Sequence, residues 1–372
     1  MTGGAYVPAE GGITTTNRWL RFDFDNPSHK ALKILAGTTF SMGETIIPFD
    51  ETTSIDLSDY ISEPGADYYV FVNADKRVVC STLRTQPDGY MFIGQFHTLC
   101  VDVGDNVTGT YPVKTSAQVG DIITLQNYFK ERDLDFYNFY TKTIDAIATG
   151  TYYNVATILH LLSGFKACDI LPESVWCLNW HPVSKIWDGM VWCNAINKCV
   201  DIYIQSGTGI DTRSEYGSVS TINRLWMNHC NDASEVGKTL FSEMEFVNIA
   251  MGSNSKRRIG YSESLVTTGG HIDTSGRRMI SFIGCEDCCG YLQQYSNDVY
   301  LYSDTSGLIY SDGQGDFGGN DDVMANMAVG GCYKDTGVSY ADIGPRSFEG
   351  DCRIDVPLSY LGGRFSCDVT IV

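Results

Sequence analysis

Apolar positions along most of the chain follow the strand period. Trp19–Asp25 alternates apolar and polar residues, as one half-buried strand does. Tyr68–Val72 and Tyr90–Gly94 are continuous apolar runs rich in aromatic and β-branched residues, as in the core strands of a β-sandwich. The runs are separated by turn sequences at Ala36–Thr38, Pro64–Asp67 and Pro87–Gly89. This pattern predicts a β-sandwich over residues 31–105, preceded by a Gly- and Thr-rich arm or attachment segment over residues 1–30.

Two successive segments follow the helix period instead. The first, Thr221–Glu235, is predicted to place Ile222, Leu225, Trp226 and His229 on one face. The second spans residues 242–251 and has a marked start, because Ser242 and Glu245 have the spacing of a capping box. Its C-terminal end is marked by Gly252, which suits a left-handed cap.

The second helix also has the apolar pattern of a packed element. Phe241, just before the cap, and Phe246 have the spacing of a hydrophobic staple. Phe246, Ile249 and Ala250 then form an apolar stripe along one side. We therefore expect a short core helix at this point in the chain.

Residues 106–165 follow neither pattern clearly. Leu125–Tyr140 is rich in aromatic residues, and together with Tyr152–Leu162 it is interpreted as a helical or mixed insertion. This region is expected to be a linker or a contact between subunits of a trimer.

Composition narrows the class of protein. The chain has 372 residues, 43% of them hydrophobic, with 38 glycines, 22 tyrosines and only 10 prolines, which favours a loop-rich, β-dominated α+β protein of two or three domains. Its net charge of −19, with no block of Lys or Arg, argues against nucleic-acid partners and anionic membranes. No apolar run reaches the roughly eighteen residues of a membrane span. The first residues lack a basic and apolar leader, so synthesis in a cytoplasm is expected.

The cysteines favour the same compartment. There are thirteen, an odd number in a chain too long for a disulfide scaffold, so most are expected to be buried, reduced thiols.

Residues 237–252 carry the most specific motif. Gly237-Lys238, Ser242-Glu243, Glu245-Phe246, Ala250 and Gly252 resemble the signature helix of C-type-lectin-like domains of the formylglycine-generating-enzyme type. That group includes the major tropism determinants of bacteriophages, which belong to the variable proteins of diversity-generating retroelements.

Further segments match those phage receptor-binding proteins in the same order. The matching positions in the first half are Lys33–Gly37, Gly65, Asp67–Tyr68, Val72, Asp75, Pro87, Gly89–Tyr90, Gly94 and Phe96–His97. Those in the second half are Asp169–Pro172, Gly189–Met190, Val200–Tyr203, Gly290–Tyr295, Gly330–Tyr333, Arg346, Gly362, Arg364 and Cys367–Asp368. Tyr295 and Tyr333 stand where the group usually has Trp. The resemblance covers about two thirds of the chain and implies a C-type-lectin-like domain over residues 166–372.

The resemblance also implies a ligand-binding face near the C-terminus, where side chains vary on a fixed backbone. The positions that correspond are Cys332, Lys334, Glu349, Asp351, Cys352, Val356, Leu358, Tyr360, Leu361 and Phe365. Tyr360 and Phe365 are the expected aromatic anchors, and Glu349, Asp351 and Arg353 the expected charged rim. The alternative is that several of these residues are simply core of a terminal hairpin.

The function that the resemblance implies is adhesion. It implies a non-enzymatic receptor-binding protein at the tip of a phage tail fibre, a homotrimer that contacts other tail proteins and a protein or glycan receptor on the host cell. A diversified cellular surface protein is an alternative.

Two further alternatives involve chemistry. Cys285, Cys288 and Cys289 would suit an enzyme of the formylglycine-generating type, but no second ligand pair follows for a metal, and buried thiols are the preferred interpretation. His271–Ser275 brings together His, Asp and Ser and is interpreted as a polar loop. No cofactor is expected, with structural calcium at the acidic loop Asp312–Asp322 as the one alternative.

Overall fold

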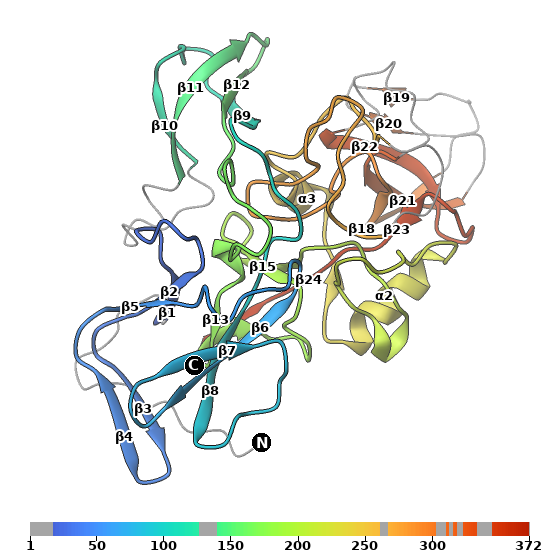
Figure 1. The fold of residues 1–372 in the computed structure, drawn as a ribbon. Helices are drawn as coiled ribbons and strands as arrows, with labels where there is room; N and C mark the ends of the chain where they lie inside the picture. The colour runs from blue at the N-terminus through green and yellow to red at the C-terminus, as the bar shows by residue number, and fades with distance from the viewer. Residues whose placement is uncertain are drawn as a thin grey trace.

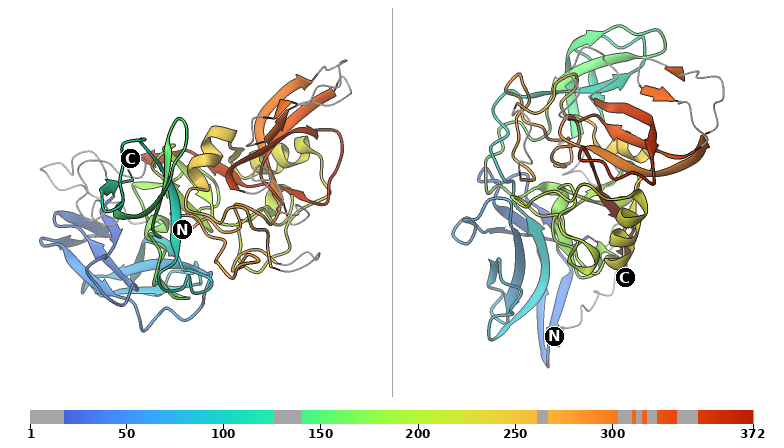
Figure 2. Two further views of the ribbon diagram at one scale, coloured as in Figure 1. Left: turned by 90° about the horizontal axis from the view of Figure 1, so that it is seen from above. Right: turned by 90° about the vertical axis from the view of Figure 1, so that its right-hand side faces the viewer.

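The computed structural model describes residues 18–125, 140–260, 267–302, 310–311, 315–317, 323–332 and 344–371. The chain has the predicted β-rich α+β fold, built from several small sheets (Figure 1). Within these ranges, its buried apolar residues form one large cluster and two small ones. The strands in the first half lie on one side of the molecule, and the two α-helices of the described residues and the last large sheet lie on the other (Figure 2).

A six-stranded sheet joins the two halves of the sequence. Its strands are β6 (Asp67–Asn73), β7 (Val78–Ser81), β8 (Tyr90–His97), β13 (Trp176–Cys177), β14 (Trp180–Pro182) and β25 (Val369–Ile371), in the order β25-β14-β13-β8-β6-β7. The strands predicted at Tyr68–Val72 and Tyr90–Gly94 are confirmed as the buried parts of β6 and β8. Because β25 pairs with β14, the end of the chain returns to the sheet that the first half begins.

The start of the described chain is part of the core. β1 (Leu20–Phe22) pairs with β2 (Ala31–Ile34), which pairs with β5 (Thr53–Asp56), while β3 (Thr38–Met42) and β4 (Thr45–Phe49) form a separate hairpin. Trp19 and Leu20 are fully buried and Phe22 is nearly so. Residues 18–22 are therefore not a free arm, and the arm remains a prediction for residues 1–17, outside the described residues.

The region 106–165 contains a small antiparallel sheet. It consists of β9 (Thr108–Val113), β10 (Ile122–Thr124), β11 (Thr141–Ala148) and β12 (Asn154–Leu159), in the order β10-β11-β12-β9, and it projects from the rest of the molecule (Figure 1). Of the helical or mixed structure expected for Tyr152–Leu162, the described residues show no helix: Asn154–Leu159 forms β12, in which buried and partly exposed positions alternate. Most of Leu125–Tyr140 lies outside the described residues.

Two more sheets form the C-terminal part. The first contains β15 (Met190–Cys193), β16 (Lys198–Asp201), β24 (Phe365–Cys367) and β17 (Thr239–Leu240), in that order. The second has the order β19-β20-β22-β21-β18-β23, with β18 (Gln293–Tyr302), β19 (Tyr310–Ser311), β20 (Gly315–Phe317), β21 (Val323–Gly330), β22 (Gly344–Arg353) and β23 (Leu361–Gly362). Two single turns of 3-10 helix, η2 (Pro172–Ser174) and η3 (Gly209–Asp211), precede α2.

The predicted core helix is confirmed as α3 (Glu243–Ile249). The Ser242 Oγ accepts from the Glu245 N–H at 3.2 Å, and the Glu245 Oε2 accepts from the Ser242 N–H at 2.8 Å, which completes the capping box. The Phe241 and Phe246 rings stack with centroids 5.4 Å apart. Gly252 has φ +84, and a Cβ there would lie 2.3 Å from the Phe282 ring, so glycine is required twice over.

The earlier helix is shorter than predicted. α2 (Trp226–Glu235) begins after Leu225, whose backbone is extended, so Ile222 and Leu225 precede the helix instead of lying on its face. Among the described residues, no helix is both long and apolar enough to cross a membrane.

Candidate ligand-binding face

The segment Ile354–Tyr360 links β22 to β23 and presents the partly exposed residues of the predicted face. Asp355 and Pro357 are exposed, and Val356, Leu358 and Tyr360 are half-buried. We call Ile354–Tyr360 the ligand loop. It lies beside α2 at the opposite end of the molecule from the β3–β4 hairpin (Figures 1 and 2).

Backbone hydrogen bonds attach the ligand loop at two points. The Asn223 N–H, just before α2, donates to the Leu358 carbonyl at 3.1 Å, and the Gln293 N–H donates to the Tyr360 carbonyl at 3.0 Å. β23 then pairs in parallel with the start of β18. The backbone of the loop is therefore held at Leu358 and at Tyr360.

Apolar packing supports the loop from below. Leu358 and Tyr360 contact a small core cluster together with Trp226 and Cys230 of α2. The buried members of that cluster are Ala233, Leu240, Tyr295, Ala328, Leu361 and Phe365. The Trp226 indole N–H donates to the Ser296 carbonyl at 2.8 Å, which fixes the ring between α2 and β18.

Three buried polar side chains, those of Asp232, Gln205 and His229, are connected by hydrogen bonds next to the same cluster. The Gln205 Nε2 donates to the Asp232 Oδ2 at 2.9 Å, so the Gln205 Oε1 is left as the acceptor that contacts the His229 Nδ1 at 2.7 Å. We therefore assign the proton of neutral His229 to Nδ1. Burial lowers the pKa of His229 to about 4, which keeps the ring neutral near pH 7. Gly363 fits here because a Cβ would lie 2.9 Å from both the Gln205 Oε1 and the His229 Nδ1.

Arg364 connects the ligand loop to the centre of the molecule. Its side chain is fully buried and donates to the carbonyls of Asp201, Ile202 and Glu286, and to the Gln294 Oε1 at 2.8 Å. A buried guanidinium needs such a complete set of acceptors. Arg364 therefore has a structural role directly after the loop.

The structure separates the ten predicted site residues into three groups. Val356, Leu358 and Tyr360 lie together on the ligand loop, partly exposed. Glu349, Asp351 and Cys352 lie on β22, which leads into the loop, and their side chains are outside the described part, as is all of Lys334. Cys332, Leu361 and Phe365 are buried, with 2%, 0% and 0% exposure.

The buried group corrects the anchor interpretation. Phe365 belongs to β24, between β16 and β17, and its ring packs in the cluster beneath the loop. Neither Phe365 nor Leu361 can therefore contact a ligand in the isolated chain. The burial of Leu361, Phe365 and Cys332 supports the alternative interpretation, in which these residues belong to the core.

Sequence reasoning missed the contribution of α2. Trp226 was expected on one face of a longer helix, whereas it is partly exposed and packs against the same core cluster as Leu358 and Tyr360. Met227, the next residue, is 52% exposed. The sequence pattern indicated this exposure, because two consecutive large apolar residues, Trp226 and Met227, cannot both lie on one buried helix face.

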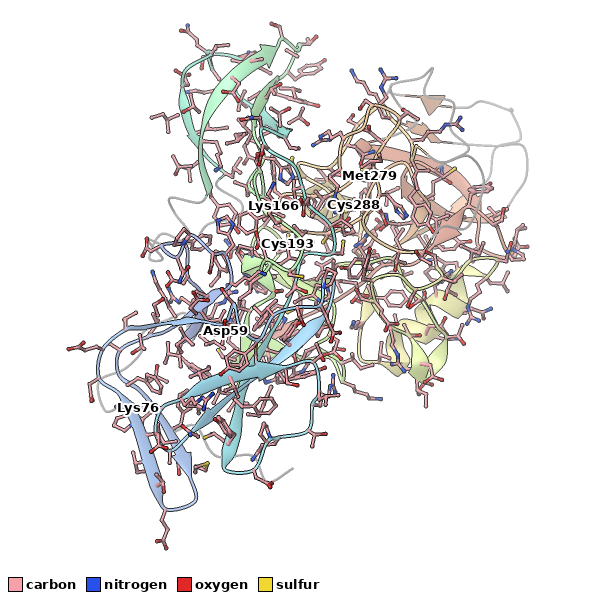
Figure 3. The ribbon with its side chains drawn as sticks, in the orientation of Figure 1. Asp59, Lys76, Lys166, Cys193, Met279 and Cys288 are labelled. Carbon is pink, nitrogen blue, oxygen red and sulfur yellow. The ribbon has the colours of Figure 1, made fainter. Side chains whose placement is uncertain are left out.

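Most of the described cysteines are buried, as expected, and Cys168 and Cys230 are partly exposed. Cys285, Cys288 and Cys289 are each fully buried, and Figure 3 shows Cys193 and Cys288 near the middle of the molecule. Burial raises the pKa of Cys285 well above its ordinary value. The environment of Cys285 is that of a packed thiol, not of an exposed nucleophile.

The other chemical alternatives find little support in the described residues. The Asp273 Oδ1 accepts from the Ser275 N–H and Oγ, as in a polar turn, while His271 pairs with Asp287 at 2.9 Å. Within the described ranges, no three His, Cys, Asp or Glu side chains come together to hold a metal. Most of the acidic loop Asp312–Asp322 lies outside those ranges, so structural calcium there stays a prediction.

The arrangement is that of a β-rich protein with a C-type-lectin-like fold and a surface loop fixed by backbone hydrogen bonds. No protein-family model and no curated protein sequence matches the chain. Solved structures do match: those of the Major Tropism Determinant U1 and M1 variants have a TM-score of 0.65 and 17% identity, and cover 100% of this chain and 87% of theirs. The P3c variant matches with a TM-score of 0.64. The predicted resemblance is confirmed at the level of the fold.

Proposed function

We propose that this chain is a viral adhesin, carried at the tip of a tail fibre, that binds a host cell-surface protein or glycan and catalyses no reaction. The observation that carries the proposal is the match of the whole chain to tropism-determinant structures. The supported ligand loop agrees with it, because a fixed backbone with half-buried apolar side chains suits recognition.

The proposed binding surface consists of Leu358 and Tyr360 of the ligand loop, with Trp226 and Met227 of α2 as a neighbouring wall. Aromatic and apolar side chains held by packing lose little conformational freedom on binding. Glu349, Asp351 and Arg353 are proposed as a charged rim that sets specificity. Variation at the ligand loop by a retroelement belongs to the same proposal, and a near-identical repeat in the DNA downstream of the gene would support it.

We further propose a homotrimer. The projecting β9–β12 sheet and its turns carry exposed apolar side chains that could pack against another subunit, Val119, Ile122 and Tyr152 at 62%, 72% and 91% exposure. Contacts through this sheet would present three ligand loops together, and several linked sites raise the overall affinity for a surface.

The test is cell binding by the labelled full-length chain, with a panel of intact bacterial strains. Replacement of Leu358 and Tyr360 together by Ala is expected to reduce binding to the recognised strain at least about tenfold, because two apolar contacts are lost. The matched control replaces Ile46 and Leu83, which are 57% and 68% exposed in the first half of the chain. Equal loss in both double variants, or no loss in the first, would count against the proposed face.

A further inference from the structure

Two cysteines face each other across neighbouring strands near the C-terminus. Cys199 of β16 and Cys367 of β24 are direct partners in the antiparallel register. Residues opposite each other in such a pair have Cα atoms about 4.5 or 5.5 Å apart. Both separations lie within the range of about 4.4–6.8 Å that a disulfide spans. The register thus places the two Cα atoms at a separation that a disulfide can span.

The surroundings make the two thiols chemically different. A hydrogen bond with the Cys199 thiol lowers the pKa of Cys367, and the Lys238 ammonium and a Ser184 backbone contact add to this against the opposing effect of burial. Burial raises the pKa of Cys199 well above its ordinary value. Lys238 is itself fixed by an ion pair of 2.6 Å with Asp201. Cys199 is fully buried and Cys367 is 6% exposed, so an oxidant reaches the Cys367 sulfur more readily.

We propose that Cys199 and Cys367 form an intramolecular disulfide when the protein meets a disulfide oxidant outside the compartment of its synthesis. The change of compartment rests on the proposed function, since a viral adhesin is made in a reducing cytoplasm and acts outside the cell. The geometry of the pair does not depend on that function.

The reaction balances with a low-molecular-weight disulfide such as oxidised glutathione. The Cys367 thiolate attacks one sulfur, the glutathione S–S bond breaks, and one glutathione thiolate leaves. Cys199 then loses its proton to solvent, and its sulfur attacks the Cys367 sulfur of the mixed disulfide and releases the second glutathione thiolate. The two cysteines lose two electrons, and one oxidised glutathione becomes two reduced molecules.

The bond would fix the strand that leaves the ligand loop. β24 follows the loop after only β23 and two residues, Gly363 and Arg364. A disulfide to β16 would therefore link the C-terminal end of β24 covalently to the neighbouring strand of the same four-stranded sheet. It would also close a very long stretch of chain, which restricts the unfolded state strongly. The oxidised protein is therefore expected to unfold at a midpoint about 5 °C or more above the reduced protein.

Tryptic peptides make the test direct. Cleavage after Lys198 and Arg213, and after Arg364, gives the peptides 199–213 and 365–372, each with a single cysteine. The full chain is incubated with excess oxidised glutathione, both folded and during refolding from urea, then alkylated and digested without reductant. The expected product is the two peptides joined, two hydrogens lighter than their sum.

The variants decide between the outcomes. Cys367→Ser should abolish the joined peptide and the rise in midpoint, and Cys199→Ser should leave Cys367 bound to glutathione. Cys80→Ser changes a buried cysteine of β7 whose register partner is Val70. This control variant should keep both the joined peptide and the rise in the unfolding midpoint. Peptides that remain separately alkylated after oxidative refolding would overturn the proposal, as would a bond from Cys367 to another cysteine. The joined peptide is detected by its mass and not by cell binding. The disulfide can therefore be confirmed even if the proposed adhesive function is wrong.

Discussion

At the scale of single residues, the ligand loop depends on buried polar groups that never meet a ligand. Arg364 has its acceptors in the protein interior, and His229 is held by Gln205, which is held in turn by Asp232. Removal of one member would leave its buried partner without a hydrogen bond, which costs more than the bond itself contributes.

His229 gives this support a pH dependence. Above about pH 6.5 the ring is neutral in both the folded and the unfolded chain, so it adds no dependence. Below that pH the unfolded chain takes up a proton that the folded chain refuses until about pH 4, where its own pKa lies. The free energy of unfolding should therefore fall by about 3 kcal/mol between these limits.

The measurement is urea unfolding of the protein and of His229→Asn from pH 7 to pH 4. Asn keeps a donor near the Nδ1 position but does not titrate. The difference in stability between the two proteins should shrink as the pH falls, because only the wild type loses this contribution. Parallel pH profiles would show that His229 does not titrate as stated.

At the scale of elements, α3 is the best-specified part of the chain. Ser242→Ala should cost about 1 kcal/mol through the lost cap. Phe246→Ala should cost about 3–5 kcal/mol, since the ring is fully buried. Met244→Ala, at a position 69% exposed on the same helix, should change stability by less than about 0.5 kcal/mol. Thermal unfolding of the three variants checks this order, and equal midpoints would contradict it.

The contrast between α3 and the ligand loop shows what sequence can predict. The cap, the staple and the buried strands β6 and β8 depend on neighbours within a few residues, so local patterns were sufficient. Whether Phe365 is exposed depends on α2 and β18, which are far away in sequence, and no local pattern records that. The same is true of β12, where strand pairing with β9 and β11 decides the structure of an ambiguous segment.

At the scale of the whole molecule, the prediction concerns assembly. Light scattering at micromolar concentration should give about three times 41.1 kDa. Replacement of Ile122 and Tyr152 by Ser should lower that mass, since it removes apolar surface from the projecting sheet, whereas Ile46→Ser should not. A monomeric wild-type protein would contradict the proposed trimer.

The return of β25 to the first six-stranded sheet has a consequence for how the gene can change. A frameshift anywhere in the codons for the ligand loop rewrites β23, β24 and β25, which leaves β14 as a sheet edge without its partner β25. Exposed edges promote aggregation, so such chains would be removed before assembly. Codon substitutions keep the reading frame and spare that edge. The pairing of β25 with β14 therefore forms only when the codons for the ligand loop are read in frame.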